Sequence, residues 1–302
     1  MNSPPPVTHV TTTRKIAYRT RGKGNGGPIV RLMSPTDLGQ VIKPFVFLDL
    51  FEVSREFMMQ AMANLPLHPH SGIATITVPV EGGYRYHDPI SGASGTINYG
   101  GLEWMRAGNG IWHGKELSAS DAPRTQGFQL WLALPPELEN SEPDGRFIEA
   151  EQTPQVGPAR IITGLYEGAQ SPVPAPQGIN CLLITLRPGE RWTYQPPAGH
   201  TVGWLALAKG QLEVGASIRT GELVVFEPGE TPITLEASGS LDSVFLLASA
   251  VPHPHDLHLG NYSVHTSAQA LEKGQRRIAE LAQLMEEAGN RNTPSGTIPV
   301  FR

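Results

Sequence analysis

The stretch LPLHPHSGIATITVPVEG, residues 65–82, combines two features that decide how this chain folds and what it can bind. Its second part, ATITV, alternates and is rich in β-branched residues, as expected for a half-buried strand. Its first part places His68 and His70 on either side of Pro69. At positions i and i+2 of an extended segment, two imidazoles project to the same side. The stretch therefore predicts a β-strand led by a histidine pair that can bind a metal on one face.

Short apolar runs separated by turns surround this stretch on both sides. The chain holds 33 glycines and 28 prolines, about a fifth of its 302 residues, where roughly 12% is usual. Because they are spread along the chain as turns, they favour an all-β fold over disorder. In the first half the strand candidates are PIVRLM (28–33), FVFLDLF (45–51), IATITVPV (73–80), GTINYG (95–100), LEWMRAG (102–108) and FQLWLALP (128–135).

A second strand series, residues 179–229, follows a Pro-rich connector and repeats the order strand, Gly turn, strand, Gly turn, strand. This order predicts one small β-barrel used twice, with the second copy diverged. Residues 266–289 differ and predict a helix, which Thr266 begins as a cap with Gln269 as its capping-box partner and which Gly289 ends. Its apolar face, expected to pack or to bind a partner, consists of Ile278, Leu281, Ala282 and Met285.

Composition excludes several classes of function. The formal net charge is -5 and no Lys/Arg-rich run is present, so we expect no direct nucleic-acid binding. No apolar stretch approaches the roughly 20 residues of a membrane span. The start, MNSPPPVTHV, lacks a secretion signal, which predicts a cytoplasmic protein. Cys181 is the only cysteine, so a metal would be held by His and carboxylate groups.

A metal site needs a third ligand, and His113 in RAGNGIWHGKEL is the best candidate. It follows a Gly-rich turn and an apolar run, as an antiparallel strand returning across a barrel would. Three imidazoles from two strands leave coordination positions open and suit iron, manganese, copper or nickel. The alternative is that His68 and His70 lie on a solvated loop. Other histidines are not expected to bind the metal. We expect His200 to be a polar side chain with its hydrogen bonds satisfied. Four more are expected on the rim or in loops: His253, His255, His258 and His265.

Four stretches resemble the pirin family, a branch of the cupins: KPFVFLDLF, LPLHPHSGIATITVPVEG, WMRAGNGIWHGKEL and FQLWLALPP. The resemblance implies an all-β bicupin of two antiparallel β-barrels (double-stranded β-helices) with a C-terminal helix. It implies one divalent metal in the N-terminal barrel, with iron expected and manganese, copper, nickel, cobalt or zinc as alternatives. The ligands it implies are His68, His70 and His113.

The resemblance and the strand pattern together divide the chain into five parts. They are a flexible arm (1–13), an N-terminal metal-binding cupin (14–140), a Pro/Gly-rich connection (141–176), a C-terminal cupin without metal (177–265), and a C-terminal helix and tail (266–302).

Two departures from the family pattern bear on the chemistry. The family usually reads His-x-Glu, whereas here His113 is followed by Gly114, Lys115 and then Glu116. In a regular strand Lys115 would share the face of His113, but a β-bulge at Gly114 would turn Glu116 inward as fourth ligand and catalytic base. Otherwise the site is three histidines plus water. The second departure is Ala74, where the family commonly has Glu, so one candidate acid/base is missing.

The resemblance implies two functions. The first is a dioxygenase similar to quercetin 2,3-dioxygenase, with a small aromatic enol or flavonol and dioxygen as substrates and Glu116 as the base. The alternative is a non-catalytic, metal-containing regulatory protein with a protein partner. A metal-free structural bicupin is a third hypothesis.

Overall fold

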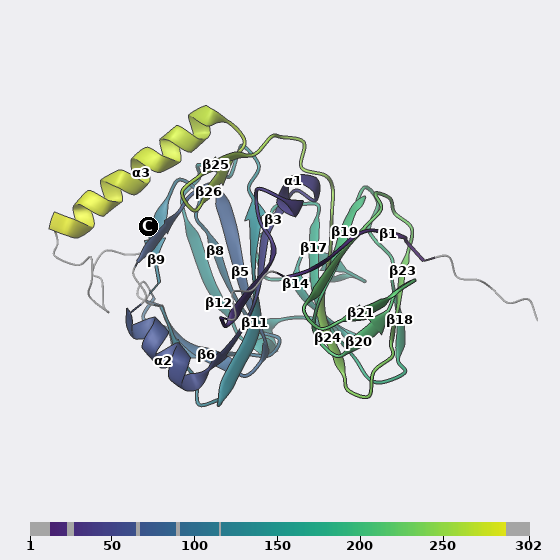
Figure 1. Cartoon of the computed structure of the whole chain (residues 1–302). Coiled ribbons are helices and arrows are strands. Elements are labelled where there is room, and N and C mark those ends of the chain that lie inside the picture. Colours follow the sequence, from purple (N-terminus) through teal and green to yellow (C-terminus); the bar gives the residue numbers. More distant parts are fainter. Residues whose placement is uncertain (1–12, 23–26, 65–66, 89–90, 115, 288–302) are drawn as a thin grey trace, which may run out of the picture.

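The computed structural model describes residues 13–22, 27–64, 67–88, 91–114 and 116–287, and the chain is mostly β with a C-terminal helix (Figure 1). Most of the predicted arm, Lys115 and Gly289 lie outside these residues. The strands form two groups of sheets, each drawn mainly from one half of the chain (Figure 1).

The first group is built on a six-stranded antiparallel sheet in the order β12-β8-β5-β11-β3-β2. Its strands are β2 (Ile29–Met33), β3 (Phe45–Ser54), β5 (Ile73–Glu81), β8 (Leu102–Arg106), β11 (Arg124–Ala133) and β12 (Asp144–Ile148). A three-stranded sheet, β10-β6-β7, and a two-stranded sheet, β4-β9, accompany it. Their strands are β4 (His68–His70), β6 (Gly83–His87), β7 (Ser94–Asn98), β9 (Ile111–His113) and β10 (Leu117–Ala119).

The second group is built on a seven-stranded sheet in the order β1-β22-β19-β24-β17-β14-β13. Its strands are β1 (Ile16–Arg21), β13 (Gln155–Val156), β14 (Ala159–Thr163), β17 (Ile179–Leu186), β19 (Val202–Lys209), β22 (Glu222–Phe226) and β24 (Ser243–Ala250). A four-stranded sheet, β18-β23-β20-β21, accompanies it. Its strands are β18 (Arg191–Tyr194), β20 (Gln211–Glu213), β21 (Ser217–Arg219) and β23 (Ile233–Ala237). Two hairpins complete the strands, β15 (Leu165–Tyr166) with β16 (Ala169–Gln170), and β25 (His258–Gly260) with β26 (Ser263–His265).

The two large sheets share a single hydrophobic core. Ile76 and Trp104 of the first sheet lie in the same buried cluster as Trp204 and Leu246 of the second. The rings of Phe45 and Trp204 meet edge to face with their centroids 5.3 Å apart. The two halves are therefore packed together through apolar faces, and burial of such area is the main stabilising contribution between them.

Strand pairings also cross between the halves. β1, near the start of the chain, pairs with β22 of the second half. Within the predicted connection, β12 pairs with β8 of the first half, while β14 pairs with β17 of the second. The connection thus contributes one strand, β12, to the six-stranded sheet and two, β13 and β14, to the seven-stranded sheet, along with the short helix η1 (Ala150–Gln152).

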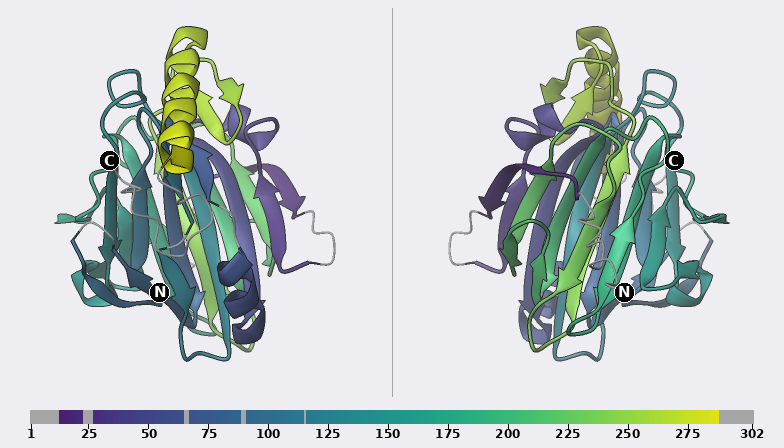
Figure 2. Two further views of the ribbon diagram at one scale, coloured as in Figure 1. Left: turned by 90° about the vertical axis from the view of Figure 1, so that its left-hand side faces the viewer. Right: turned by 90° about the vertical axis from the view of Figure 1, so that its right-hand side faces the viewer.

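Three α-helices are present in the described residues, and only the last was predicted. α1 (Leu38–Val41) and α2 (Arg55–Asn64) interrupt the first strand series. α3 (Ala268–Glu287) lies along the outer side of the first half, away from the second half (Figures 1 and 2). None of the helices described is both long and apolar enough to cross a bilayer.

The predicted packing face of α3 is confirmed, but its predicted cap is wrong. Ile278, Leu281 and Met285 are buried, and Ala282 is partly buried. The side chain of Ser267, not Thr266, accepts the hydrogen bond from the N–H of Ala270 at 3.1 Å. The hydroxyl of Thr266 instead donates to a carboxylate in the first half, as described below, so it is not available to cap the helix.

Candidate metal centre

The histidine-bearing strands β4 and β9 pair with each other in antiparallel register. His68 lies opposite His113, Pro69 opposite Trp112, and His70 opposite Ile111. The predicted antiparallel strand carrying His113 is therefore present beside the strand of His68 and His70. The Nε1–H of Trp112 donates to a carbonyl of α3 at 3.0 Å, so this side chain points away from the histidines, as its alternation predicted.

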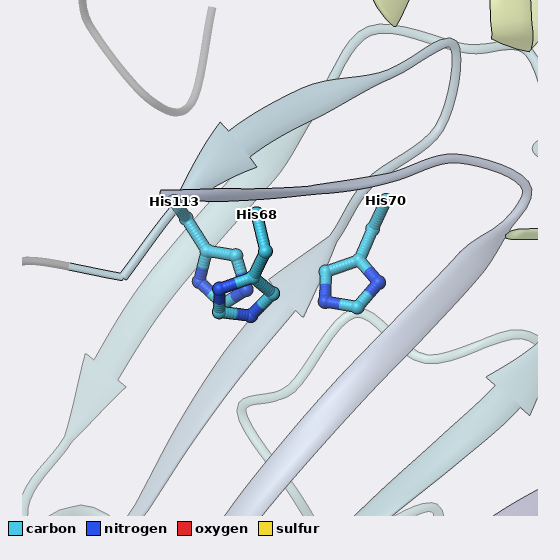
Figure 3. A group of neighbouring side chains, drawn as sticks. All are labelled: His68, His70 and His113. Carbon is cyan, nitrogen blue, oxygen red and sulfur yellow. The ribbon is translucent and has the colours of Figure 1, made fainter. Parts of the chain in front are cut away.

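The three imidazoles converge on one point. Each offers a ring nitrogen, and these nitrogens all lie within 4.8 Å of one another. The ring centroids of His68 and His113 are 4.3 Å apart, and that of His70 lies 5.1 Å from His113 and 5.2 Å from His68. Figure 3 shows the three rings on the same side of the strand pair, pointing toward one another. This cluster is able to hold a metal ion.

Two of the ligand atoms are buried without a partner. His70 is 1% exposed and His113 7%, and the Nε2 atoms of both have no hydrogen-bond partner among the described residues. A buried polar atom without a partner costs free energy, which coordination to a cation would recover. Burial, followed by the neighbouring charge of His68, lowers the pKa of His70 to about 3 and that of His113 well below its ordinary value. Neutral imidazole is the form that binds metals, so the donor set fits a divalent cation.

His70 has a further contact that orients its ring. Its Nδ1 lies 2.9 Å from the backbone carbonyl of Tyr262. A carbonyl oxygen only accepts hydrogen bonds, so Nδ1 must carry the proton. The lone pair of this ring is then on Nε2, the atom that faces the cluster. Nothing in the local sequence around Tyr262 predicts this contact.

Glu116 lies beside the histidine cluster. β9 ends at His113, and Gly114 has φ of 133°, a conformation that favours glycine. The Glu116 side chain is buried; its Oε2 accepts a hydrogen bond from the Gly114 N–H at 2.9 Å and lies 4.0 Å from Nδ1 of His113. The chain therefore leaves the strand at Gly114 and returns the carboxylate toward His113, although Glu116 is not among the three residues of the converging group.

A second buried carboxylate, Glu103, was missed in the sequence. It lies on β8 opposite Thr77. Burial, followed by the charge of Glu116, raises the pKa of Glu103 to about 7. The sequence does contain a feature that indicates a buried carboxylate, because Glu103 is an acidic residue inside the apolar run LEWM.

Ala74 does not leave a gap in this site. Its side chain belongs to the core between the two large sheets, together with Ile76 and Val78. A carboxylate at this position would enter that apolar core rather than the histidine cluster. The absence of Glu here therefore removes no charged group from the histidine side of β5.

Aromatic rings form part of the surroundings. Trp131 stacks on Phe47 with ring centroids 4.2 Å apart, and its ring lies 5.0 Å from that of His70. Tyr262 is 52% exposed as a residue, and its ring centroid lies 6.2 Å from that of His68 and 6.0 Å from that of His70. An exposed aromatic ring next to the cluster places apolar, polarisable surface beside the proposed metal position.

One of the histidines assigned to the rim is in fact fully buried. His265 lies in β26, where its Nε2 is 2.9 Å from Oγ of Ser71 and its Nδ1 is 3.2 Å from Oε2 of Glu139. The rim prediction for His265 is wrong because the C-terminal hairpin folds back onto the loop after β4, a contact that local sequence does not reveal. His253 lies in a loop but is also largely buried. The prediction for His200 is confirmed, since its Nδ1 lies 2.9 Å from Oγ of Ser249.

Solved structures of related proteins share this fold. A quercetin 2,3-dioxygenase from Acinetobacter baumannii is 22% identical, with a TM-score of 0.73 over 89% of this chain and 98% of that one. A bacterial pirin from Escherichia coli, in complex with nickel(II), is 20% identical, with a TM-score of 0.57 over 80% of this chain and 98% of that one.

Sequence comparisons identify relatives along most of the chain. Residues 29–132 match the Pirin family. A Pseudomonas aeruginosa protein provisionally named quercetin 2,3-dioxygenase is 29% identical over 76% of this chain and 84% of its own length. A pirin-like protein of Solanum lycopersicum is 31% identical over 72% of this chain and 74% of its own length. This protein therefore belongs to the pirin family.

Proposed function

We propose that this protein is a dioxygenase that acts on a flavonol or a similar aromatic enol and uses one divalent metal ion, iron, held by His68, His70 and His113. The observation that carries the proposal is the pair of buried Nε2 atoms, on His70 and His113, that face each other's rings without a hydrogen-bond partner in the described residues. The provisional dioxygenase name of the Pseudomonas relative supports the choice of reaction.

The proposed architecture is a bicupin of two antiparallel β-barrels. We assign the metal-binding barrel to residues 14–140 and the barrel without metal to 177–265, joined through 141–176 and followed by the helix and tail. The expected location remains the cytoplasm. The six- and seven-stranded sheets, each with a smaller sheet beside it, support two barrels, although β1 of the first assigned part pairs in the second sheet.

In this proposal a bound metal supplies Lewis acidity and open coordination positions for an enol oxygen and for dioxygen. The chain's own residues prepare the site. His70 and His113 stay neutral because they are buried, and so remain ligands near neutral pH. Glu116 accepts the substrate's hydroxyl proton from its position next to His113, with Gly114 N–H holding one carboxylate oxygen. The exposed ring of Tyr262 offers an aromatic substrate a surface to stack on.

A non-catalytic, metal-containing regulatory protein is the second candidate. The observation that favours it is that the converging group contains three histidines without Glu116, whose carboxylate is hydrogen-bonded to Gly114. In this case the metal would shape a surface for a protein partner.

Two measurements separate these functions. Metal content of protein purified without added metal, beside His68→Ala, tests the site: one metal per chain in the wild type and near zero in the variant is expected. Oxygen uptake by iron-loaded protein with a panel of flavonols then tests the reaction, with Glu116→Gln as the base variant. Metal without uptake would favour the regulatory candidate, and a wild type without metal would reject both.

A further inference from the structure

The hairpin β25–β26 lies directly against the strand that carries His68 and His70. Ser71, the residue after β4, forms an isolated parallel bridge with Ser263. The Val264 N–H donates to the Ser71 carbonyl at 3.3 Å. Through this alignment the turn of the hairpin presents the carbonyl of Tyr262 to Nδ1 of His70 at 2.9 Å.

A buried polar network anchors the hairpin to the first half. Ser71 Oγ donates to Ser263 Oγ at 3.0 Å, which leaves its oxygen to accept from Nε2 of His265 at 2.9 Å. On its other side the His265 ring faces Glu139, at 3.2 Å. Glu139 also accepts the Thr266 N–H at 2.6 Å and the Thr266 hydroxyl at 2.7 Å. Every member of the network therefore holds the hairpin close to β4 or to the turn after β11.

The packing leaves no room for side chains between these elements. A Cβ atom at Gly72, where φ is +72°, would lie 2.0 Å from the Val264 carbonyl oxygen. A Cβ atom at Gly274 of α3 would lie 2.6 Å from Ser71 Oγ and 2.8 Å from His265 Nε2. Such close approach fixes the distance between the hairpin, the helix and the histidine strand.

Tyr262 holds a backbone conformation that tyrosine rarely adopts. Its φ is 55°, in the left-handed region, which is unfavourable for a residue with a side chain. Since Tyr262 is half exposed, burial of its side chain does not explain the conformation. Tyr262 is instead the second residue of the two-residue turn between β25 and β26, where a turn can require a positive φ, and in this turn its carbonyl is directed at His70.

We propose that the hairpin β25–β26, anchored by the His265–Glu139 pair, is a positioning element of the metal centre, and that the Tyr262 carbonyl holds His70 in the tautomer whose Nε2 lone pair faces the metal. The proposal rests on the metal site proposed above but not on dioxygenase activity. Loss of such an orienting partner weakens metal binding by about 10- to 100-fold in other metal sites.

The first experiment measures the tautomer in metal-free, full-length protein labelled with ¹⁵N-histidine. Long-range ¹H–¹⁵N correlation spectra at pH 7.5 report which ring nitrogen carries the proton, and His70→Gln assigns the His70 signals. We expect the Nδ1–H form in the wild type and in Tyr262→Gly, because glycine adopts the same φ and keeps the carbonyl. Tyr262→Pro, whose φ is fixed near −65°, should displace the carbonyl and give a mixture of tautomers. An Nε2–H form in the wild type, or no change in Tyr262→Pro, would overturn the proposal.

The second experiment measures Co²⁺ affinity by competition with a chelator, and the visible absorption of the bound ion. We expect Tyr262→Pro and His265→Ala to bind Co²⁺ about 10- to 100-fold more weakly with altered absorption bands, and Tyr262→Gly to match the wild type. His200→Ala is the matched control, because it removes an equally buried, hydrogen-bonded histidine from the second half. Equal weakening in His200→Ala would show general destabilisation and refute the positioning role.

The two experiments also separate this inference from the proposed function. A wild type that binds no Co²⁺ would reject the metal site, and the tautomer of His70 would still test the role of the Tyr262 carbonyl.

Discussion

His70 and Tyr262 are 192 residues apart in the chain, yet Nδ1 of His70 and the carbonyl oxygen of Tyr262 lie 2.9 Å apart. The contact joins the first histidine strand to the hairpin that precedes the C-terminal helix. The surroundings of the candidate metal centre are consequently drawn from both halves of the chain, although its candidate ligands all lie in the first half.

Removing one of the buried imidazoles should abolish metal binding. We expect His113→Ala to bind less than a tenth of the Co²⁺ or Fe²⁺ bound by the wild type, because its ring nitrogen is one of the three within 4.8 Å. Metal analysis after gel filtration measures this. His87→Ala is the control, since His87 is exposed and bonded to Ser94; full occupancy in His113→Ala would remove this residue from the site.

Glu103→Gln should become progressively more stable than the wild type as pH rises. The folded-state pKa of Glu103 is raised from 4.5 to about 7, first by burial and then by the charge of Glu116. The stabilisation associated with its protonated form is complete below about pH 4.5 and is lost as pH passes about 7. Each tenfold change in proton affinity corresponds to ~1.4 kcal/mol. At high pH the free energy of unfolding of the variant should therefore exceed that of the wild type by up to about 3 kcal/mol. Urea unfolding of metal-free protein at pH 5 and pH 8 measures the difference, and a pH-independent difference would contradict the assignment.

Glu139→Gln should show the opposite pH dependence. Burial raises the pKa of Glu139, but its contacts with His265 and Thr266 outweigh burial and lower the pKa below its ordinary value. Its charged form therefore stabilises the fold above about pH 4.5, and this contribution disappears as pH falls through the lowered folded-state pKa. At pH 7 we expect the free energy of unfolding of the variant to be about 1–3 kcal/mol lower than that of the wild type. Thermal unfolding of wild type and variant at pH 7 and pH 3.5 tests this: the gap in melting temperature should narrow at the lower pH.

Gly274→Ala should destabilise the protein although alanine favours helices by ~1 kcal/mol over glycine. The added methyl would lie 2.6 Å from Ser71 Oγ and 2.8 Å from His265 Nε2, both held in the buried network. We expect a net loss of about 1–3 kcal/mol, in line with overpacking elsewhere. Lys273→Ala, an exposed change on the same helix, should stay within about 0.5 kcal/mol. An unfolding midpoint in urea for Gly274→Ala at or above that of Lys273→Ala would disprove the tight packing.

By itself, the sequence determined the β character of the chain, the histidine strand pair and the packing face of the last helix. These follow from local periodicity: alternation places His68 and His70 on one side, and helical spacing aligns Ile278, Leu281 and Met285. Even the turn to Glu116 depends on a neighbouring glycine: the sequence suggested that Gly114 adopts a backbone conformation favouring glycine, and its φ in the structure is 133°.

Only the tertiary structure decided what surrounds the cluster. It turns Ala74 toward the core between the halves and Glu103 toward Thr77 and Glu116, and it buries His265 against Ser71 and Glu139. These contacts join residues far apart in the chain. The alternation of apolar and polar residues along a strand shows that the strand has two different faces, but it does not show which other elements each face will contact. The neighbours of each face are fixed only when the sheets and the C-terminal hairpin pack, because apolar side chains are then buried and polar groups hydrogen-bonded by residues from distant parts of the chain.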